Sequence, residues 1–363
     1  MRLLEVQDLR VSFSTDDGVV EAVRGVSFDL DRGHTLGIVG ESGSGKSVCT
    51  QTIAGLTRGA TVSGNAFFDG VDLLTAQPDE LRQIRGKRIG MIFQDPLSSL
   101  HPLYRIGWQI REMIQAHDSS VTRQQARTRA AELLGLVGIP HPEERLDDYP
   151  HQFSGGMRQR VMIAMAMALN PDLLVADEPT TALDVTVQAQ VLAVMTRLQR
   201  EFGTAIVLIT HDLGVVAEVA DDVVVMHAGV VMEHAPRRET FYHHHNPYTE
   251  GLFDSLPAVG AGRRRLTPIR GTPPSVIELP PGCSFAPRCP YAFDRCWAAE
   301  PPLARVFGDV HHWSACWLPA DLVARTAMRD RLRAETAEAA AAAAADETVE
   351  TAETAEGAEG AAS

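Results

Sequence analysis

The residues with the clearest chemical meaning form a glycine-rich run between positions 40 and 47. The run fits the pattern G-x-x-x-x-G-K-[ST] at every position and follows a short apolar segment. Backbone N–H groups of such a loop, with the start of the next helix, cradle phosphate groups. Lys46 would neutralise the β and γ oxygens, and the Ser47 hydroxyl would bind Mg²⁺. The predicted nucleotide-binding residues are Gly40, Glu41, Ser42, Gly43, Ser44, Gly45, Lys46 and Ser47.

Two adjacent carboxylates follow another apolar segment, Leu173–Ala176. A phosphate loop needs a metal-binding carboxylate at the end of a neighbouring strand, and Asp177 is in that position. We expect Asp177 to hold Mg²⁺ through water and Glu178 to act as the general base on the attacking water. Without the phosphate loop, an Asp-Glu pair of this kind could simply be an acidic turn that follows a core strand.

A third motif, Ser154-Gly155-Gly156, opens a helical run 23 residues before Asp177. A serine and free N–H groups at a helix start can bind an anion, although alone they indicate only a helix cap. With the phosphate loop and the carboxylates, the motif has the position of the ABC signature. Over about residues 1–235 the sequence resembles the ABC ATPases.

The resemblance implies further roles, each at a matching motif. Phe13 corresponds to the aromatic that stacks on adenine, and Gln94 to the glutamine that reaches Mg²⁺ and the water. Asp184 matches the D-loop, and His211 matches the histidine that contacts the γ-phosphate. Taken singly, Gln94, Asp184 and His211 could instead be a loop amide, a helix cap and a core histidine. The catalytic residues are therefore predicted to be Glu178, His211 and Gln94, with Ser47, Gln94 and Asp177 at the Mg²⁺.

The family geometry implies a head-to-tail dimer in which each ATP lies between one phosphate loop and the opposite signature. Ser154, Gly155 and Gly156 would then serve the partner's ATP. The chain holds one set of motifs, so a second copy or a paralogous ATPase must supply the other half.

The elements that position these motifs alternate between strand-like and helical patterns. Alternating apolar runs at Leu3–Phe13 and Val20–Leu30 predict a hairpin around an Asp-Asp-Gly turn. Short apolar strands and helices then predict βαβ units and an α/β fold with a parallel sheet. The resemblance implies the rest of the architecture: a P-loop ABC-type nucleotide-binding domain with a parallel-sheet core, an antiparallel β-subdomain and a helical subdomain. The remaining predicted elements are a strand at Thr35–Val39, helices within Leu100–Leu169, a helix at Val185–Glu201, and strands at Leu173–Ala176, Ala205–Thr210 and Asp222–Met226.

Composition divides the chain into three parts. Residues 1–235 form the predicted nucleotide-binding domain, with the helical subdomain at about 98–170. Residues 236–334, rich in Pro, Gly, Arg and Cys, form a small cysteine-containing C-terminal extension. Residues 335–363 are an Ala/Glu-rich run that we expect to be a disordered acidic tail.

Four segments narrow the resemblance: the signature Phe-Ser-Gly-Gly-Met-Arg-Gln-Arg, the run Asp95–Pro102 after Gln94, Asn246–Thr249, and Gly282–Pro290. Together they resemble the ATP-binding subunit of oligopeptide/dipeptide importers. The resemblance implies two transmembrane permease subunits as partners and, indirectly, an extracytoplasmic substrate-binding protein. It also implies a groove for a permease coupling helix. Aliphatic residues between Leu100 and Ile114 could line that groove or pack within the helical subdomain.

Four cysteines near the C-terminus, Cys283, Cys289, Cys296 and Cys316, lack the spacing of zinc knuckles or of the compact ferredoxin run. Four thiols this close in a cytosolic chain favour metal ligation over disulfides, and soft thiolates suit [4Fe–4S] or Zn²⁺. The resemblance points to a [4Fe–4S] cluster, with Zn²⁺ and unmetallated thiols as alternatives. The fifth, Cys49, is expected to be a buried small residue.

Charge and hydropathy exclude several classes of protein. The net charge is −14, and the run from Glu335 to Ser363 carries eight acidic residues and no basic one. A chain of this sign has no general affinity for nucleic acid. The N-terminus lacks a signal-peptide pattern, and no apolar run is long enough to span a membrane. We therefore expect a peripheral protein at the cytoplasmic face of the membrane, held there by the permease.

Peptide import is the leading hypothesis, and three alternatives remain. The cargo could be another one, such as nickel chelates or glycosides. A soluble nucleic-acid-maintenance ATPase would typically carry long insertions between Lys46 and Ser154, which this chain lacks. A redox-sensing protein built on the cysteines would not need Glu178.

Overall fold

The computed structural model describes residues 1–95, 99–181, 183–255, 268–306, 311–319 and 324–332. Two compact units divide the chain: Met1–His244 with Pro273–Glu278, and His245–Thr272 with the residues from Leu279 onward. The first unit therefore continues past the boundary predicted at residue 235 and takes in a short segment from the extension. The predicted acidic tail, 335–363, lies outside the described residues.

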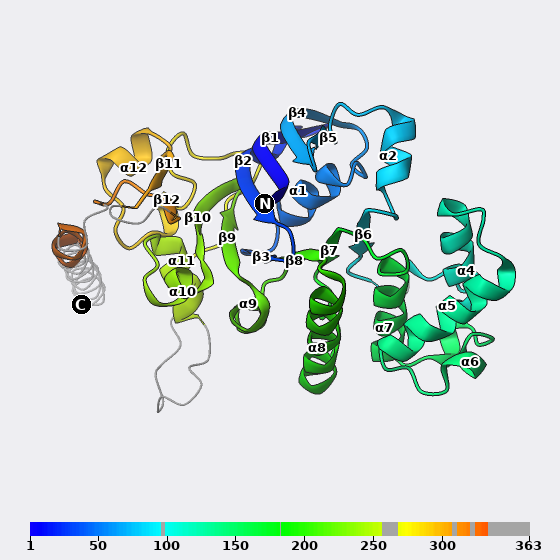
Figure 1. The fold of residues 1–363 in the computed structure, drawn as a ribbon. Coiled ribbons are helices and arrows are strands. Elements are labelled where there is room, and N and C mark those ends of the chain that lie inside the picture. The colour runs from blue at the N-terminus through cyan, green and yellow to red at the C-terminus, as the bar shows by residue number, and fades with distance from the viewer. Residues whose placement is uncertain (96–98, 182, 256–267, 307–310, 320–323, 333–363) are drawn as a thin grey trace, which may run out of the picture. The chain divides into compact units, whose positions relative to one another are not determined.

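An antiparallel sheet of the first unit begins with the predicted hairpin. Strands β1 (Arg2–Thr15) and β2 (Gly18–Asp31) pair around the turn at Asp16-Asp17, and β1 also pairs with β4 (Ala60–Phe68). The sheet order is β2-β1-β4-β5, with β5 at Val71–Asp72. Its inward side chains, Leu4, Val6 and Phe68 among them, are buried in a core shared with the neighbouring sheet. Figure 1 shows the strands of this antiparallel sheet in blue.

The core sheet of the first unit carries the nucleotide-binding motifs. Five of its strands are parallel, in the order β9-β3-β8-β7-β6, and β10 joins antiparallel beside β9. Strands β3, β7 and β8 are buried along their whole length, which explains their continuous apolar sequences. The strands are β3 (Thr35–Val39), β6 (Ile89–Ile92), β7 (Leu173–Asp177), β8 (Ala205–Ile209), β9 (Asp222–His227) and β10 (Val230–Pro236).

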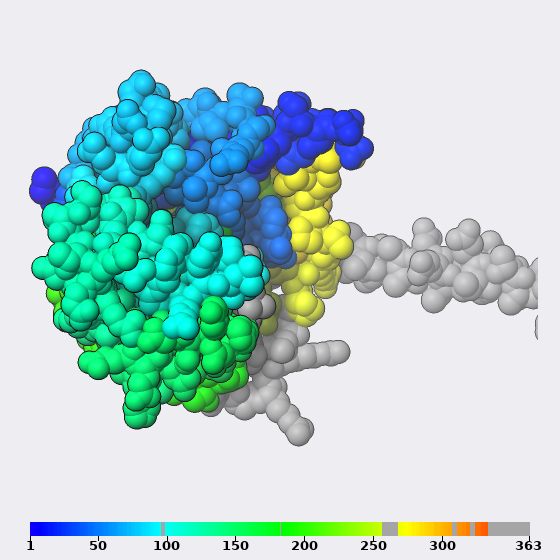
Figure 2. Space-filling view, turned by 90° about the vertical axis from the view of Figure 1, so that its right-hand side faces the viewer, coloured from blue at the N-terminus to red at the C-terminus, as the bar shows by residue number. Residues whose placement is uncertain are grey.

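The helical region between β6 and β7 shares a core with the core sheet. Ile106, Ile110, Leu133, Val161 and Ile163 lie in one buried cluster with Leu174 of β7 and Leu208 of β8. Figure 2 shows the residues of this region, in cyan to green, together on one face of the molecule. The helices are α4 (Ile106–His117), α5 (Arg123–Leu136), α6 (Pro142–Arg145) and α7 (Gly155–Ala166), with a 3₁₀ turn at Pro150–Gln152 before α7.

The other helices of the first unit flank its sheets, and α8 matches the helix predicted at Val185–Glu201. They are α1 (Lys46–Ile53), α2 (Pro78–Ile84), α8 (Val185–Phe202), α9 (Leu213–Val219) and α10 (Arg237–Tyr242). The fold expected from the sequence, an α/β ABC cassette with two sheets and a helical region, is confirmed. No helix in the described ranges is long and apolar enough to cross a membrane.

The second unit is held together by short elements and buried polar contacts. Asn246 caps α11 by accepting from the Tyr248 N–H at 3.0 Å, and its amide donates to Ala315 O at 3.0 Å. Arg329 pairs with Glu250 and donates to the Tyr291 hydroxyl. The elements are α11 (Pro247–Asp254), a 3₁₀ turn at Ala286–Arg288, α12 (Asp294–Ala298), β11 (Leu303–Arg305) and β12 (Trp313–Ala315), followed by helical residues 324–332.

Candidate nucleotide-binding site

The phosphate loop joins the end of β3 to the start of α1, and two of its glycines are required by their surroundings. Gly40 has φ +150°, and a Cβ there would lie 2.1 Å from Met226 O. Gly45 has φ +96°, and its Cβ would lie 2.3 Å from Ala22 O. No side chain fits at these distances, so strands β2 and β9 hold the two ends of the loop at close range.

Lys46 lies across this loop instead of pointing into solvent. Its Nζ donates to Gly40 O at 2.8 Å and to Glu41 O at 2.9 Å. Burial lowers the pKa of Lys46, while the nearby carboxylates of Glu178 and Asp177 act in the opposite direction. The ammonium is thus held at the loop where phosphate oxygens would accept its hydrogen bonds.

The two predicted Mg²⁺ ligands are direct neighbours. The Ser47 hydroxyl donates to Asp177 Oδ1 at 2.8 Å. Burial raises the pKa of the Asp177 carboxyl and the charge of Glu178 adds to this, whereas hydrogen bonds from Ser47 and Gln51 oppose it. A hydroxyl and a carboxylate at the end of a buried strand are the oxygen donors that Mg²⁺ prefers. These two residues therefore fit the ion.

Glu178 brings the remaining predicted catalytic residues together. Gln94 Nε2 donates to Glu178 Oε2 at 3.0 Å, and Thr181 Oγ1 donates to the same oxygen at 2.9 Å. His211 Nδ1 lies 3.5 Å from Glu178 Oε1, and the His211 side chain is 57% exposed, so it is not a core histidine. Glu178 has φ +46°, and non-glycine residues adopt this conformation mainly where a site demands it.

The signature motif and Asp184 both sit at helix starts. Ser154 caps α7 by accepting from the Met157 N–H at 3.3 Å, and Asp184 caps α8 by accepting from the Val187 N–H at 3.0 Å. A Cβ at Gly155 would meet nothing within 4 Å, whereas one at Gly156 would lie 2.5 Å from Val187 Cγ1. Gly155 is thus open to an approaching molecule, and Gly156 is needed for packing inside the chain.

Phe13 lies in β1 opposite Val20 and packs half-buried against the core of the two sheets. Its stacking on adenine stays a prediction, as do the roles assigned to the other site residues.

Comparison with known proteins places this arrangement in a family. Residues 23–181 match the family model described as ABC transporter, and residues 232–296 match the oligopeptide/dipeptide transporter C-terminal region. The chain is 52% identical over 321 residues to the oligopeptide transport ATP-binding protein OppD of Bacillus subtilis (strain 168), covering 87% of this chain and 89% of that protein.

The chain belongs to the oligopeptide/dipeptide group of ABC transporter ATPases. It is 49% identical to the dipeptide transport ATP-binding protein DppD of the same Bacillus strain, over 87% of this chain and 95% of that protein. Among solved structures, a dimeric ATP-binding cassette in a post-hydrolysis state with ADP and Pi matches with a TM-score of 0.59. It is 28% identical and covers 65% of this chain and 99% of its own. The chain is accordingly an ATP-hydrolysing transport subunit, in a family whose cassettes dimerise and partner with membrane permeases.

Two side chains of the site are not predicted from the sequence, because neither belongs to a recognised motif. Thr181 and Gln51 hydrogen-bond the carboxylates of Glu178 and Asp177 respectively. Thr181 lies three residues after Glu178 and Gln51 one helical turn after Ser47, so only their spacing from known motifs could have indicated them.

The predicted metal site at the four cysteines is not supported by the described side chains, of which no three His, Cys, Asp or Glu are arranged to hold a metal ion. Burial foremost, then the charges of Cys316 and Cys296, raises the pKa of Cys283 to about 11. Burial and the other three thiols likewise raise the pKa of Cys289. The donor chemistry therefore suits a soft metal.

Cys49 matches its prediction. Its side chain is fully buried, and burial raises the pKa of its thiol to about 12.

Proposed function

We propose that this chain powers the import of di- and oligopeptides through an ABC permease. The observation that carries the proposal is the cluster at Asp177 and Glu178, where Ser47, Gln94, Thr181 and His211 converge within hydrogen-bonding or ion-pairing distance. Such a cluster joins a metal-ligand pair to a base, as phosphoryl transfer to water requires. The peptide cargo is supported by the names of the relatives, which are oligopeptide and dipeptide transport proteins.

We assign the chemistry as follows. Lys46 and the N–H groups of the loop bind the phosphates. Ser47 and Asp177 would hold Mg²⁺, which would supply positive charge against the phosphate oxygens. Glu178 accepts the proton of the attacking water, and Gln94 orients that water. His211, which lies 3.5 Å from the other carboxylate oxygen of Glu178, is assigned the contact with the γ-phosphate.

We further propose that two ATPase subunits, the second a paralogue, pair head to tail. Each would place Ser154 and Gly155 on the ATP of the other. The exposed helix start of α7 supports this, because Ser154 and Gly155 are exposed and nothing lies within 4 Å of a Cβ at Gly155. The N–H groups at this helix start are available to an anion brought by a second molecule.

An apolar groove in the first unit is the proposed docking site for the permease. It has a volume of about 270 Å³ and lies between the end of α1, strand β6 and helices α4 and α7. Leu56 and Phe93 on it are 42% and 38% exposed, and Met113, Met162 and Met165 line it as well. Methionines adapt to the shape of a partner, so an amphipathic permease helix fits this groove. Docking there would hold the chain at the cytoplasmic face of the membrane.

The groove divides the aliphatic residues that were candidates for its wall. Leu100 and Met113 line it, and Leu100 is also buried in the same core cluster as Ile106, Ile110 and Ile114. Packing within the helical region therefore accounts for most of these residues, and Met113 is the residue of the segment that best supports the proposed docking.

The cargo is tested by reconstituting the chain with its two permeases and the second ATPase in vesicles. ATP hydrolysis should rise when a binding protein loaded with a di- or oligopeptide is added. If a nickel chelate or a glycoside stimulates ATP hydrolysis and peptides do not, that compound and not a peptide is the cargo. Absence of MgATP hydrolysis under all these conditions would refute the ATPase itself.

We propose that Cys283, Cys289, Cys296 and Cys316 bind a [4Fe–4S] cluster, with Zn²⁺ as the alternative. The support is four partly buried thiols with no disulfide among the described cysteines, and a raised pKa at Cys283 and Cys289 to which the other thiols contribute after burial. Anaerobic purification followed by iron, sulfide and zinc analysis distinguishes the two metals. If the Cys289→Ser variant loses the metal but binds MgATP normally, the metal has a structural or regulatory role.

A further inference from the structure

The first turn of α8 is hydrogen-bonded to the turn that carries His211. Gln188 Nε2 donates to Asp212 Oδ2 at 3.1 Å, and Asp212 directly follows His211 in the chain. Both side chains of this pair are half-buried. The start of α8 is itself fixed, because Asp184 caps it by accepting from the Val187 N–H at 3.0 Å. The bond therefore ties the His211 turn to a well-defined helix end.

The His211 turn is held through the residues on either side of the histidine. Thr210 is buried, donates its N–H to Ile38 O at 3.2 Å, and accepts from the Asp212 N–H through its hydroxyl at 3.0 Å. After the histidine, Asp212 Oδ1 caps α9 by accepting from the Gly214 N–H at 2.8 Å. The His211 side chain is 57% exposed, so the position of its ring depends on the backbone of this turn.

The two carboxylate oxygens of Asp212 serve different elements. Oδ1 fixes the residue to its own helix, α9, whereas Oδ2 fixes it to α8 through Gln188. A hydrogen bond to a charged acceptor contributes more than one between neutral groups. Loss of the Gln188 bond would leave the cap of α9 in place but release the His211 turn from α8.

We propose that Gln188 is a positioning residue for His211. Acting through Asp212, it holds the imidazole beside Glu178, where His211 Nδ1 lies 3.5 Å from Oε1. The inference rests on the proposed role of His211 at the γ-phosphate. A small displacement of a group that contacts the reacting phosphate lowers the rate of the chemical step. Gln188 then contributes to turnover without touching the nucleotide.

The first test compares Gln188→Ala and Gln188→Glu with the unaltered chain, each assembled with the permeases and the second ATPase. The alanine variant removes the bond, and kcat for MgATP should fall about 3- to 10-fold. The glutamate variant should be slower still, because it places a second carboxylate against Asp212. The Kd for MgATP should stay within about twofold in both variants, since Lys46 and the phosphate loop are unchanged.

A reciprocal exchange separates positioning from a general loss of structure. In Gln188→Glu/Asp212→Asn the donor and the acceptor change places, so the hydrogen bond can form again. Asparagine caps a helix about as well as aspartate, so its oxygen can still accept from the Gly214 N–H. The kcat of the double variant should return to within about twofold of that of the unaltered chain.

Gln190→Ala is the matched control on the same helix. Gln190 is exposed and accepts a hydrogen bond from Arg160 of α7, on the other side of α8 from no part of the His211 turn that the bond to Asp212 involves. Its loss should leave kcat unchanged.

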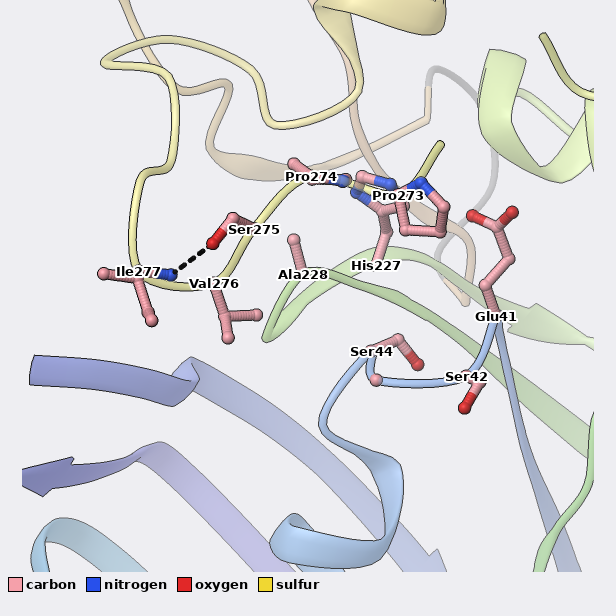
Figure 3. Close-up of a pocket in the computed structure, with 11 residues that line it drawn as sticks. Glu41, Ser42, Ser44, His227, Ala228, Pro273, Pro274, Ser275, Val276 and Ile277 are labelled. Carbon is pink, nitrogen blue, oxygen red and sulfur yellow. Dashed lines mark hydrogen bonds between the residues drawn. The ribbon is translucent and has the colours of Figure 1, made fainter. Parts of the chain in front are cut away.

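A pocket of about 260 Å³ beside the phosphate loop supplies a second control (Figure 3). Val276 lines this pocket opposite Glu41–Ser44, and neither Gln188 nor Asp212 is among its lining residues. Val276→Ala therefore changes the surroundings of the loop but not the His211 turn, and it should leave kcat unchanged.

Two results would overturn the inference: an unchanged kcat in Gln188→Ala, or a Gln188→Glu/Asp212→Asn variant that stays as slow as Gln188→Glu. Failure of the unaltered chain to hydrolyse MgATP would instead refute the proposed function, so the two failures are distinguishable.

Discussion

At the scale of single residues, Glu178 is the point on which the site depends. Its two carboxylate oxygens meet the side chains of Gln94, Thr181 and His211, and its φ of +46° is uncommon for a residue with a side chain. Backbone strain of this kind costs on the order of 1–3 kcal/mol and persists where surrounding contacts determine it. These contacts fix the orientation of the carboxylate.

Replacement of Glu178 by glutamine should separate ATP binding from hydrolysis. Gln cannot accept the proton of water, so turnover in the assembled transporter should fall by about 100-fold or more. ATP affinity should stay near normal, because Lys46, Ser47 and Asp177 remain. Glu218→Gln, an exposed carboxylate on α9, is the control and should change neither quantity. Near-normal turnover in Glu178→Gln would contradict the role of general base.

Acidification should weaken binding of the Mg²⁺–nucleotide complex at a higher pH than it would if Asp177 had the ordinary pKa of an aspartate. The pKa of Asp177 is raised, chiefly by burial, so this carboxyl takes up a proton at a higher pH than the usual Asp. Protons and Mg²⁺ then compete for one oxygen donor, and affinity falls as pH decreases through the raised pKa. Titration with Mg²⁺ at several pH values measures this. Nucleotide affinity without Mg²⁺ should change less over the same range.

At the scale of elements, the packing of α7 on α8 gives two neighbouring glycines, Gly155 and Gly156, different surroundings. The signature motif in the sequence gives no reason to distinguish them. Gly156 is in close contact with Val187, whereas Gly155 borders open space. The sequence predicted both as ligands of the partner's ATP. The contact with Val187 comes from residues 31 positions apart, and no local pattern encodes such a distance.

Gly156→Ala should therefore destabilise the chain by about 1–3 kcal/mol, the usual cost of overpacking. Adding Val187→Ala removes the clashing methyl groups and should restore much of the lost melting temperature. Gly155→Ala is the matched control, and its melting temperature should be unchanged. If the double variant remains as unstable as Gly156→Ala, packing against α8 is not the reason for the glycine.

A closed group of ion pairs ties the ends of several strands of the first unit together. Asp69 pairs with Arg32 and with Arg88, whose guanidinium also binds Asp172 at 2.7 Å. Hydrogen bonds from Arg88 and Arg32 hold the pKa of Asp69 below its ordinary value. The network therefore joins the two sheets. Asp69 follows β4 of the antiparallel sheet, and Arg88 and Asp172 directly precede β6 and β7 of the core sheet.

Asp69→Asn should lower the free energy of unfolding by about 1 kcal/mol at neutral pH, since these partly exposed pairs are screened by solvent. A carboxyl with a lowered folded-state pKa stabilises the protein above its unfolded pKa and ceases to do so as pH falls through the folded value. The difference from the unaltered protein should thus shrink in acid. Asp79→Asn, whose pair with Arg82 is almost fully exposed, should have a smaller effect.

At the scale of the whole molecule, the sequence predicted the sheets and the nucleotide motifs because both follow local rules. Thr35–Val39, for example, is a strand with the predicted bounds, and the hairpin turns at the predicted Asp-Asp-Gly. The return of Pro273–Ile277 to the first unit could not be predicted, since it depends on contacts with residues more than 200 positions earlier. The arrangement of the four cysteines likewise depends on distances that spacing does not set.

The groove between α1, β6 and the helical region yields the prediction that tests assembly. Leu56→Glu places a charge on an exposed rim residue that the permease helix would cover, and an unpaired charge buried in an apolar contact is costly. Copurification with the permease should fall by about tenfold or more, while MgATP binding by the isolated chain stays unchanged. Val62→Glu, on β4 outside the groove and similarly exposed at 38%, is the control and should assemble normally. Equal assembly of both variants would exclude the groove as the docking site. Because ATP binding is measured on the same preparations, that result would leave the ATPase assignment intact and redirect the search to other surfaces.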